Sequence, residues 1–146
     1  MVGSNEGASV GAGQYLERRI GSVSQYPLVT IVDDDDAVRT AIESLVRSLG
    51  LRTSTFASAD AFLDSGRVKD TDCLITDVQM PGMSGIELQS RLRGQGSTVP
   101  VIFVTAFPEE RIRRQVMAAG AIGFLSKPFD GGTMIACIDQ ALSAAN

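Results

Sequence analysis

The chain has 146 residues, of which 44% are hydrophobic and 21% charged, and its formal net charge at pH 7 is −4. This length and balance are typical of one globular domain with a full core, and the acidic charge argues against nucleic-acid binding by this chain alone. No apolar segment is long enough to cross a membrane and no signal-peptide pattern opens the chain, so we expect no membrane contact and a cytoplasmic location.

The chain contains no histidine. This excludes Ser-His-Asp and Cys-His catalysis, histidine general bases and the common zinc sites, and the chain cannot itself be a histidine phosphoryl donor. Cys73 and Cys137 are too few for a disulfide framework, and both lie in apolar stretches that favour small buried hydrophobes. The chemistry that is left must use carboxylate, hydroxyl, amine or metal.

Residues 1–26 are rich in glycine, serine and alanine, which predicts a flexible N-terminal extension with a short helix around residues 15–20. From Leu28 onward, apolar runs typical of buried parallel strands alternate with segments of helical spacing. The predicted strands are 28–32, 53–56, 73–76, 101–104 and 122–125. The predicted helices lie around 38–49, 59–65, 86–92, 112–119 and 135–142. Ser58 is the expected N-cap of the second helix.

Five strand–helix units in succession predict an α/β fold, in which a doubly wound parallel sheet carries helices on both faces. Ligands in such folds bind outside the carboxyl ends of the strands. The polar residues at those ends are therefore the candidates for a functional site.

Four consecutive aspartates, Asp33 to Asp36, come directly after the first predicted strand. Carboxylates crowded at a strand end repel one another, and a hard cation such as Mg²⁺ offsets that cost. We assign only Asp33 and Asp34 to such a site. Asp35 and Asp36 are predicted to cap the first helix, where negative charge is favourable.

Three further polar residues end strands of the same predicted sheet. Asp77 follows the third strand, Thr105 the fourth and Lys127 the fifth. Each has an ordinary interpretation alone: a helix cap, a β-branched strand end and a solvated charge. Their convergence on one edge indicates chemistry on phosphate. One acid can attack phosphorus and form an acyl phosphate, while a cation and Lys127 neutralise the phosphoryl oxygens.

Four pieces of the chain carry a resemblance to a known family. They are Val32-Asp33-Asp34, the segment 77–85, Thr105-Ala106 and the segment 123–129. Together they resemble a response regulator receiver domain of two-component signalling, most like its FixJ/NarL-type branch. The resemblance implies a flavodoxin-like (βα)5 fold of strand order 2-1-3-4-5, of which receivers are an example. It divides the chain into an extension, 1–26, and a receiver domain, 27–146.

The resemblance implies a role for each candidate residue. Asp77 is the phosphoacceptor and takes the phosphoryl group from a sensor histidine kinase, while Thr105 and Lys127 contact that group. Mg²⁺ or Mn²⁺ is the expected cofactor. Its implied ligands are Asp33, Asp34, Asp77 and the main-chain carbonyl of Gln79. The protein would not be a turnover enzyme, and it would catalyse only its own phosphorylation and dephosphorylation.

The resemblance also implies a conformational switch. Thr105 and Phe124 occupy the switch positions, although Phe124 is equally well explained as a core residue. The face formed around residues 108–142 would then control a phosphorylation-dependent homodimer or the docking of a partner. The same resemblance implies a cis peptide between Lys127 and Pro128. Residue 124 is a phenylalanine where a tyrosine is frequent, so a hydroxyl contact is absent.

Other functions remain as alternatives. A metal-dependent aspartyl phosphatase needs a second aspartate two residues after the nucleophile, and this chain has Gln79 there. A nucleotide-binding domain needs a glycine-rich turn after the first strand, where this chain has aspartates. A degenerate receiver that only binds proteins is opposed by the complete set of acids, threonine and lysine. Transcriptional control follows if a DNA-binding output domain continues the chain, and a single-domain regulator is the other reading.

Overall fold

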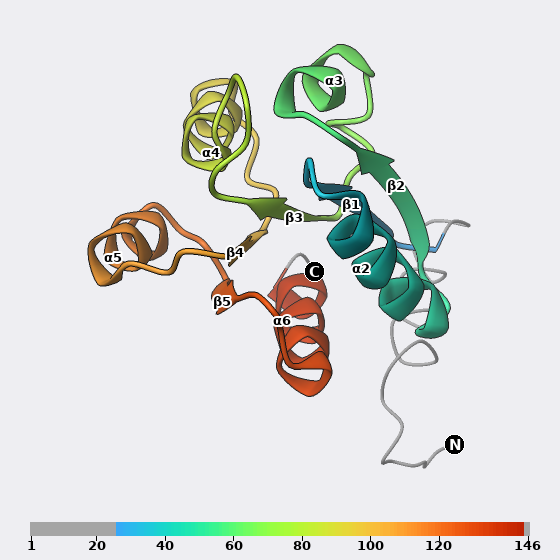
Figure 1. Ribbon diagram of the computed structural model, residues 1–146. Coiled ribbons are helices and arrows are strands. Elements are labelled where there is room, and N and C mark those ends of the chain that lie inside the picture. Colours follow the sequence, from blue (N-terminus) through green and yellow to red (C-terminus); the bar gives the residue numbers. More distant parts are fainter. Residues whose placement is uncertain (1–25, 145–146) are drawn as a thin grey trace.

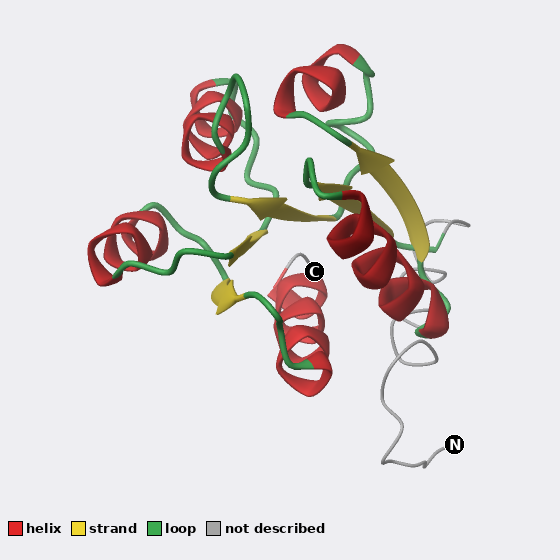
Figure 2. Ribbon diagram, viewed as in Figure 1, coloured by secondary structure: helices red, strands yellow, loops and turns green. Residues whose placement is uncertain are grey.

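The computed structural model describes residues 26–144, so the predicted extension and its short helix lie outside the described residues apart from Tyr26. The strands are β1 (Leu28–Val32), β2 (Arg52–Phe56), β3 (Cys73–Asp77), β4 (Val101–Thr105) and β5 (Gly123–Ser126). The helices are α2 (Asp36–Ser48), α3 (Ala59–Asp64), α4 (Gly85–Gly94), α5 (Glu110–Ala118) and α6 (Gly131–Ala144). Strands and helices alternate as predicted (Figure 2).

The strands form one parallel sheet in the order β2-β1-β3-β4-β5, which confirms the flavodoxin-like prediction. Figure 1 shows α2 and α6 on one face of the sheet and α3, α4 and α5 on the other. Because both faces are covered, the central strands β1, β3 and β4 are buried along their whole length. The edge strand β2 is half-buried and mostly polar.

Each face of the sheet has its own apolar cluster. Ile42 of α2 belongs to the first, together with residues of α6, and Phe62 of α3 belongs to the second, together with residues of α4 and α5. Cys73 is fully buried in the first cluster, as predicted, and Cys137 is half-buried beside it. No helix in residues 26–144 is long and apolar enough to cross a membrane.

The aspartate run divides between two roles at the start of α2. Asp35 is the N-cap, and its side chain accepts hydrogen bonds from the main-chain N–H groups of Ala37 and Val38. Asp36 lies in the first turn, where its charge complements the helix dipole. The prediction that these two residues begin a helix is confirmed, and it leaves Asp33 and Asp34 at the edge of the sheet.

Four of the five strands differ from the predicted bounds by one residue at one or both ends, and the differences in β3 and β4 concern the site. Asp77 and Thr105 are the last residues of β3 and β4, whereas the apolar pattern placed them just after those strands. The ladder continues because their main chains still pair with the neighbouring strands, opposite Val104 and Ser126. The strand therefore fixes the backbone of each of these two residues.

Candidate functional site

The candidate residues meet at the carboxyl edge of the sheet, as the strand-end argument predicts. The Nζ atom of Lys127, just after β5, lies 2.9 Å from Oδ2 of Asp77 and 3.0 Å from Oδ2 of Asp33. Three separate strand ends thus contribute to one contact. The peptide between Lys127 and Pro128 is cis, as the resemblance implied.

Asp33 is the most buried acid of the group, with 1% of its surface exposed. Its Oδ1 accepts a hydrogen bond from the main-chain N–H of Asp35 at 2.9 Å. Its Oδ2 faces Lys127 at ion-pair distance but has no hydrogen-bond partner among the described residues. Burial raises the pKa of Asp33 above its usual value, and the negative charge of Asp77 acts in the same direction.

Lys127 is the counter-charge of the site. Burial alone would lower the pKa of its ammonium, but the hydrogen bond that it donates to Asp77, its ion pair with Asp33 and the negative charges of both acids outweigh that effect and raise the pKa. The lysine is therefore a permanent cation at neutral pH. A neutral amine there would leave two buried carboxylates without compensation.

The acids fit a divalent cation. Asp33, Asp34 and Asp77 each offer a carboxylate oxygen, and these oxygens lie within 4.8 Å of one another. The cluster holds three carboxylates, of which Asp33 and Asp77 pair with the ammonium of Lys127, and a hard, oxygen-seeking cation would offset the remaining excess of negative charge. The unpartnered buried Oδ2 of Asp33 is a second sign of the same need. Asp34 is exposed, so the cluster opens to solvent.

Asp77 is buried, and each of its two carboxylate oxygens accepts one hydrogen bond. It is 6% exposed, its Oδ2 accepts from Lys127 and its Oδ1 accepts from the main-chain N–H of Gln79 at 3.3 Å. Gln79 itself is exposed beside the acid. Its carbonyl as a metal ligand stays a prediction, because the contact that the structure records is made by the amide nitrogen.

The two residues that the sequence analysis places at switch positions, Thr105 and Phe124, lie in different surroundings. Thr105 is buried, and its hydroxyl oxygen accepts from the N–H of Phe107 at 3.1 Å, while its carbonyl accepts from the N–H of Lys127 at 2.8 Å. Within the described residues the hydroxyl makes no hydrogen bond to Asp77. Phe124 of β5 is half-buried against the second apolar cluster, so its role in a switch stays a prediction.

Two positioning residues escaped the sequence analysis. Gly85 donates its N–H to the carbonyl of Val78 at 2.8 Å, and a Cβ there would lie 2.0 Å from the carbonyl oxygen of Asp77. Arg39 donates from Nη1 to the carbonyl of Asp33 at 2.6 Å and also pairs with Asp36. In the sequence, the signal for the close contact of Gly85 with Asp77 was a glycine at the first position of a helix. No local pattern signals the contact of Arg39 with Asp33.

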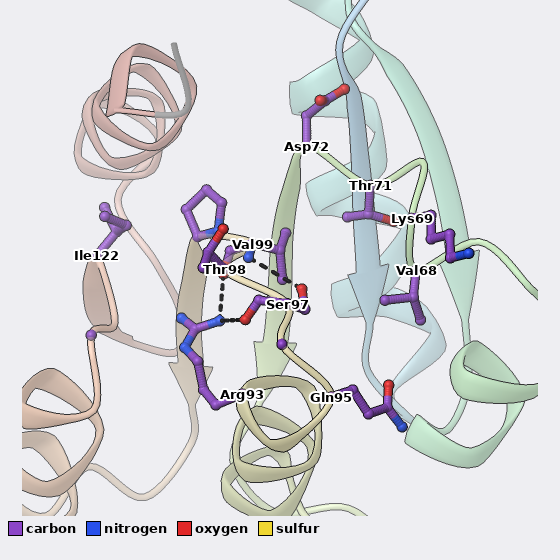
Figure 3. Close-up of a pocket in the computed structure, with 13 residues that line it drawn as sticks. Val68, Lys69, Thr71, Asp72, Arg93, Gln95, Ser97, Thr98, Val99 and Ile122 are labelled. Carbon is purple, nitrogen blue, oxygen red and sulfur yellow. Dashed lines mark hydrogen bonds between the residues drawn. The ribbon is translucent and has the colours of Figure 1, made fainter.

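A depression of about 820 Å³ lies at the opposite, amino edge of the sheet and takes no part in this chemistry (Figure 3). Arg93 lies in it, but its Nη1 donates to the carbonyls of Ser97 and Val99 at 3.2 and 2.9 Å. Burial lowers the pKa of this guanidinium. Its role is to tie the end of α4 to the loop before β4.

A doubly wound sheet with an acid–lysine site at its carboxyl edge defines a class of phosphate-handling α/β domains. The response regulator receiver domain family matches residues 29–139, and the chain belongs to this family. Receiver domains of two-component systems are phosphorylated by histidine kinases, and they use Mg²⁺ at an acidic pocket of this kind.

Known proteins agree with this assignment. The chain is 42% identical over 114 residues to the transcriptional regulatory protein FixJ of Azorhizobium caulinodans, covering 78% of this chain and 54% of that protein. It is 42% identical over 121 residues to the response regulator protein TmoT of Ectopseudomonas mendocina, covering 83% and 55%. The solved structure of the response regulator StyR matches with a TM-score of 0.77 at 41% identity, covering 82% and 61%. The chain thus spans about half the length of the curated relatives it matches, and the likeness to FixJ agrees with the predicted branch.

Gly85→Ala tests the close contact of α4 with Asp77. The added methyl group would overlap the Asp77 carbonyl, so we expect the free energy of unfolding to fall by about 1–3 kcal/mol, the cost of overpacking. Gly94→Ala, at the end of the same helix, is the matched control, because its Cβ would meet nothing within 4 Å. Urea unfolding followed by circular dichroism measures both. Equal effects of the two substitutions would show that the contact is not tight.

Asp33→Asn tests the electrostatic cost of the acidic site. Because burial raises the pKa of Asp33, its ionised form opposes folding at neutral pH, and the neutral amide should raise the free energy of unfolding in EDTA. In the wild type, Mg²⁺ at ten times its Kd should add about 1.4 kcal/mol, and the variant should lose most of that gain. Urea unfolding with EDTA or Mg²⁺ measures both quantities, and Asp64→Asn, an exposed acid at the end of α3, is the control. A variant with an undiminished Mg²⁺ gain contradicts the assignment of Asp33.

Proposed function

We propose that residues 27–146 form a cytoplasmic receiver domain in which Asp77 accepts a phosphoryl group from a sensor histidine kinase. The observation that carries the proposal is the buried Asp77 carboxylate, held by Lys127 at 2.9 Å beside a second buried acid. A simple strand-end cap requires neither the lysine nor Asp33. The 146 residues contain no histidine, so a histidine phosphoryl donor lies outside this stretch of chain.

The chemical step is a displacement at phosphorus. A carboxylate oxygen of Asp77 forms a bond to phosphorus while the bond from phosphorus to the imidazole nitrogen of the donor breaks, and the electron pair stays on that nitrogen. The ammonium of Lys127 already lies at the acceptor carboxylate and neutralises charge on the phosphoryl oxygens. The N–H of Gln79 fixes the orientation of the carboxylate through Oδ1.

The same acids serve as the cation site. We assign Mg²⁺, or Mn²⁺, to the carboxylates of Asp33, Asp34 and Asp77 and the main-chain carbonyl of Gln79. The unpartnered Oδ2 of Asp33 and the spacing of the three carboxylates support this assignment. When bound, the cation supplies positive charge that offsets the phosphoryl oxygens and the acids together.

Phosphorylation of Asp77 then acts on the neighbouring surface formed by α5, β5 and α6. A phosphoryl group adds about −1.5 to −2 charge next to Lys127 and offers new acceptor oxygens. The hydroxyl of Thr105 can exchange the N–H of Phe107 for the phosphoryl group, and the space that it leaves can admit the ring of Phe124. These movements shift the α5–β5–α6 face from its resting arrangement towards a second arrangement, which forms a homodimer or docks a partner.

Two alternatives receive less support. An aspartyl phosphatase needs a general acid two residues after the nucleophile, and the amide of Gln79 cannot donate a proton in that way. A degenerate receiver would not be expected to keep the contacts of Lys127 with both acids. Self-catalysed phosphorylation and dephosphorylation are therefore the proposed activities. Transcriptional control is the proposed output where an output domain is attached, since FixJ is described as a transcriptional regulatory protein.

Incubation with Mg²⁺ and acetyl phosphate, followed by intact mass spectrometry, tests the acceptor. Wild type should gain the mass of one phosphoryl group, Asp77→Asn should gain none and Lys127→Met should gain far less, because the charge that stabilises the phosphoryl oxygens is removed. Asp64→Asn removes one exposed carboxylate outside the site, at the end of α3, and this control should react like wild type. A wild type that stays unmodified by both this donor and a kinase would refute the proposal.

Light scattering with the phosphoryl mimic beryllofluoride tests the switch. We expect the mass of the wild type to rise towards that of a dimer when Mg²⁺ and beryllofluoride are both present, because the mimic favours the arrangement of the α5–β5–α6 face that associates. Asp77→Asn should keep the monomer mass under the same conditions. An unchanged wild-type mass together with unchanged partner binding opposes the proposed output.

A further inference from the structure

Gln89 is a buried polar residue between α4 and α5, on the face of the sheet that carries the second apolar cluster. It lies on α4 with 2% of its surface exposed, and Leu88 and Leu92 of the same helix are also buried. Its Nε2 donates a hydrogen bond of 3.3 Å to the main-chain carbonyl of Val116 on α5. The function proposed above assigns no role to this residue.

This hydrogen bond differs from the packing around it because it is directional. Apolar side chains at a helix interface can slide past one another at little cost, whereas a buried amide that loses its partner is strongly disfavoured. The Val116 carbonyl would not suffer the same loss, since it also accepts from the N–H of Ala121 at 2.9 Å. The penalty for moving α5 therefore falls on the side chain of Gln89.

The two helices have different relations to the site. The start of α4 is fixed at Asp77, because Gly85 packs against the Asp77 carbonyl and the Ser84–Glu87 capping box closes the first turn. Helix α5 instead follows the Thr105 loop and precedes β5, so it belongs to the face that the switch rearranges. Figure 1 shows α4 and α5 as neighbours on the same face of the sheet. The Gln89 bond thus joins the fixed part of the fold to the movable part.

We propose that the amide of Gln89 is a latch that holds α5 in the resting arrangement and sets how readily phosphorylation of Asp77 switches the α5–β5–α6 face. This inference rests on the proposed function, because it concerns the threshold of that same switch. Two hydrogen bonds hold the resting arrangement. The Thr105 hydroxyl accepts one from the N–H of Phe107, and Val116 of α5 accepts the other from Gln89. A phosphoryl group must then overcome both bonds to move the face.

Gln89→Met tests the latch, because methionine keeps the length of the side chain, suits an apolar interface and cannot donate the bond. Loss of one buried neutral hydrogen bond from the resting state should lower the apparent Kd for beryllofluoride, with Mg²⁺ present, by about two- to tenfold. The dimer dissociation constant should fall by a similar factor, even without the mimic. Gln95→Met, an exposed glutamine at the end of the same helix, is the matched control and should leave both constants at the wild-type value.

A purely structural role for Gln89 would change thermal stability and leave both constants unchanged, and that result overturns the latch. A second measurement uses the wild type alone and does not depend on how the variant folds. The side-chain amide of Gln89, observed by NMR, should lose its protection from hydrogen exchange when beryllofluoride binds; retained protection also overturns the latch. A wild type that does not respond to beryllofluoride would refute the proposed function itself, and the two failures are thereby distinguished.

Discussion

The ammonium of Lys127, held between the carboxylates of Asp77 and Asp33, is the interaction on which the rest of the site depends. Two buried acids side by side would repel each other and would each lose solvation. A lysine at the end of a different strand offsets that cost only because parallel strands bring their carboxyl ends to one edge. The doubly wound sheet is therefore the condition for having this cluster of charges at all.

Lys127 neutralises only part of the negative charge of these acids, and the remaining charge favours binding of a cation. Asp33 keeps a buried oxygen without a hydrogen bond, and three carboxylates still outnumber one ammonium. A site that was fully neutral and fully hydrogen-bonded would gain nothing from a cation. The same burial that raises the pKa of Asp33 thus strengthens the attraction of the site for positive charge.

Two neighbouring helices of the same layer contact this edge differently. Helix α4 packs against the backbone of Asp77, where only a glycine at position 85 fits. The next helix, α5, follows the loop after Thr105, and a buried hydrogen bond from the side-chain amide of Gln89 joins it to α4. This difference suits the proposed phosphorylation switch, because the charge must stay in place while its surroundings respond.

The sequence by itself determined the α/β class, the alternation of elements, the division of the aspartate run and the candidates Asp77, Thr105 and Lys127. These are local properties: apolar runs, helical spacing and polar residues at strand ends can be seen along the chain. The strand order came from the resemblance, since periodicity alone does not order strands. Only the tertiary structure decided that Lys127 contacts both acids, that Asp33 keeps an unpartnered oxygen, that Gly85 touches Asp77 and that Gln89 bonds to Val116. The three contacts join residues that are separated along the chain. The energy of a buried charge or amide depends on where the fold places its partner, or whether it places one at all.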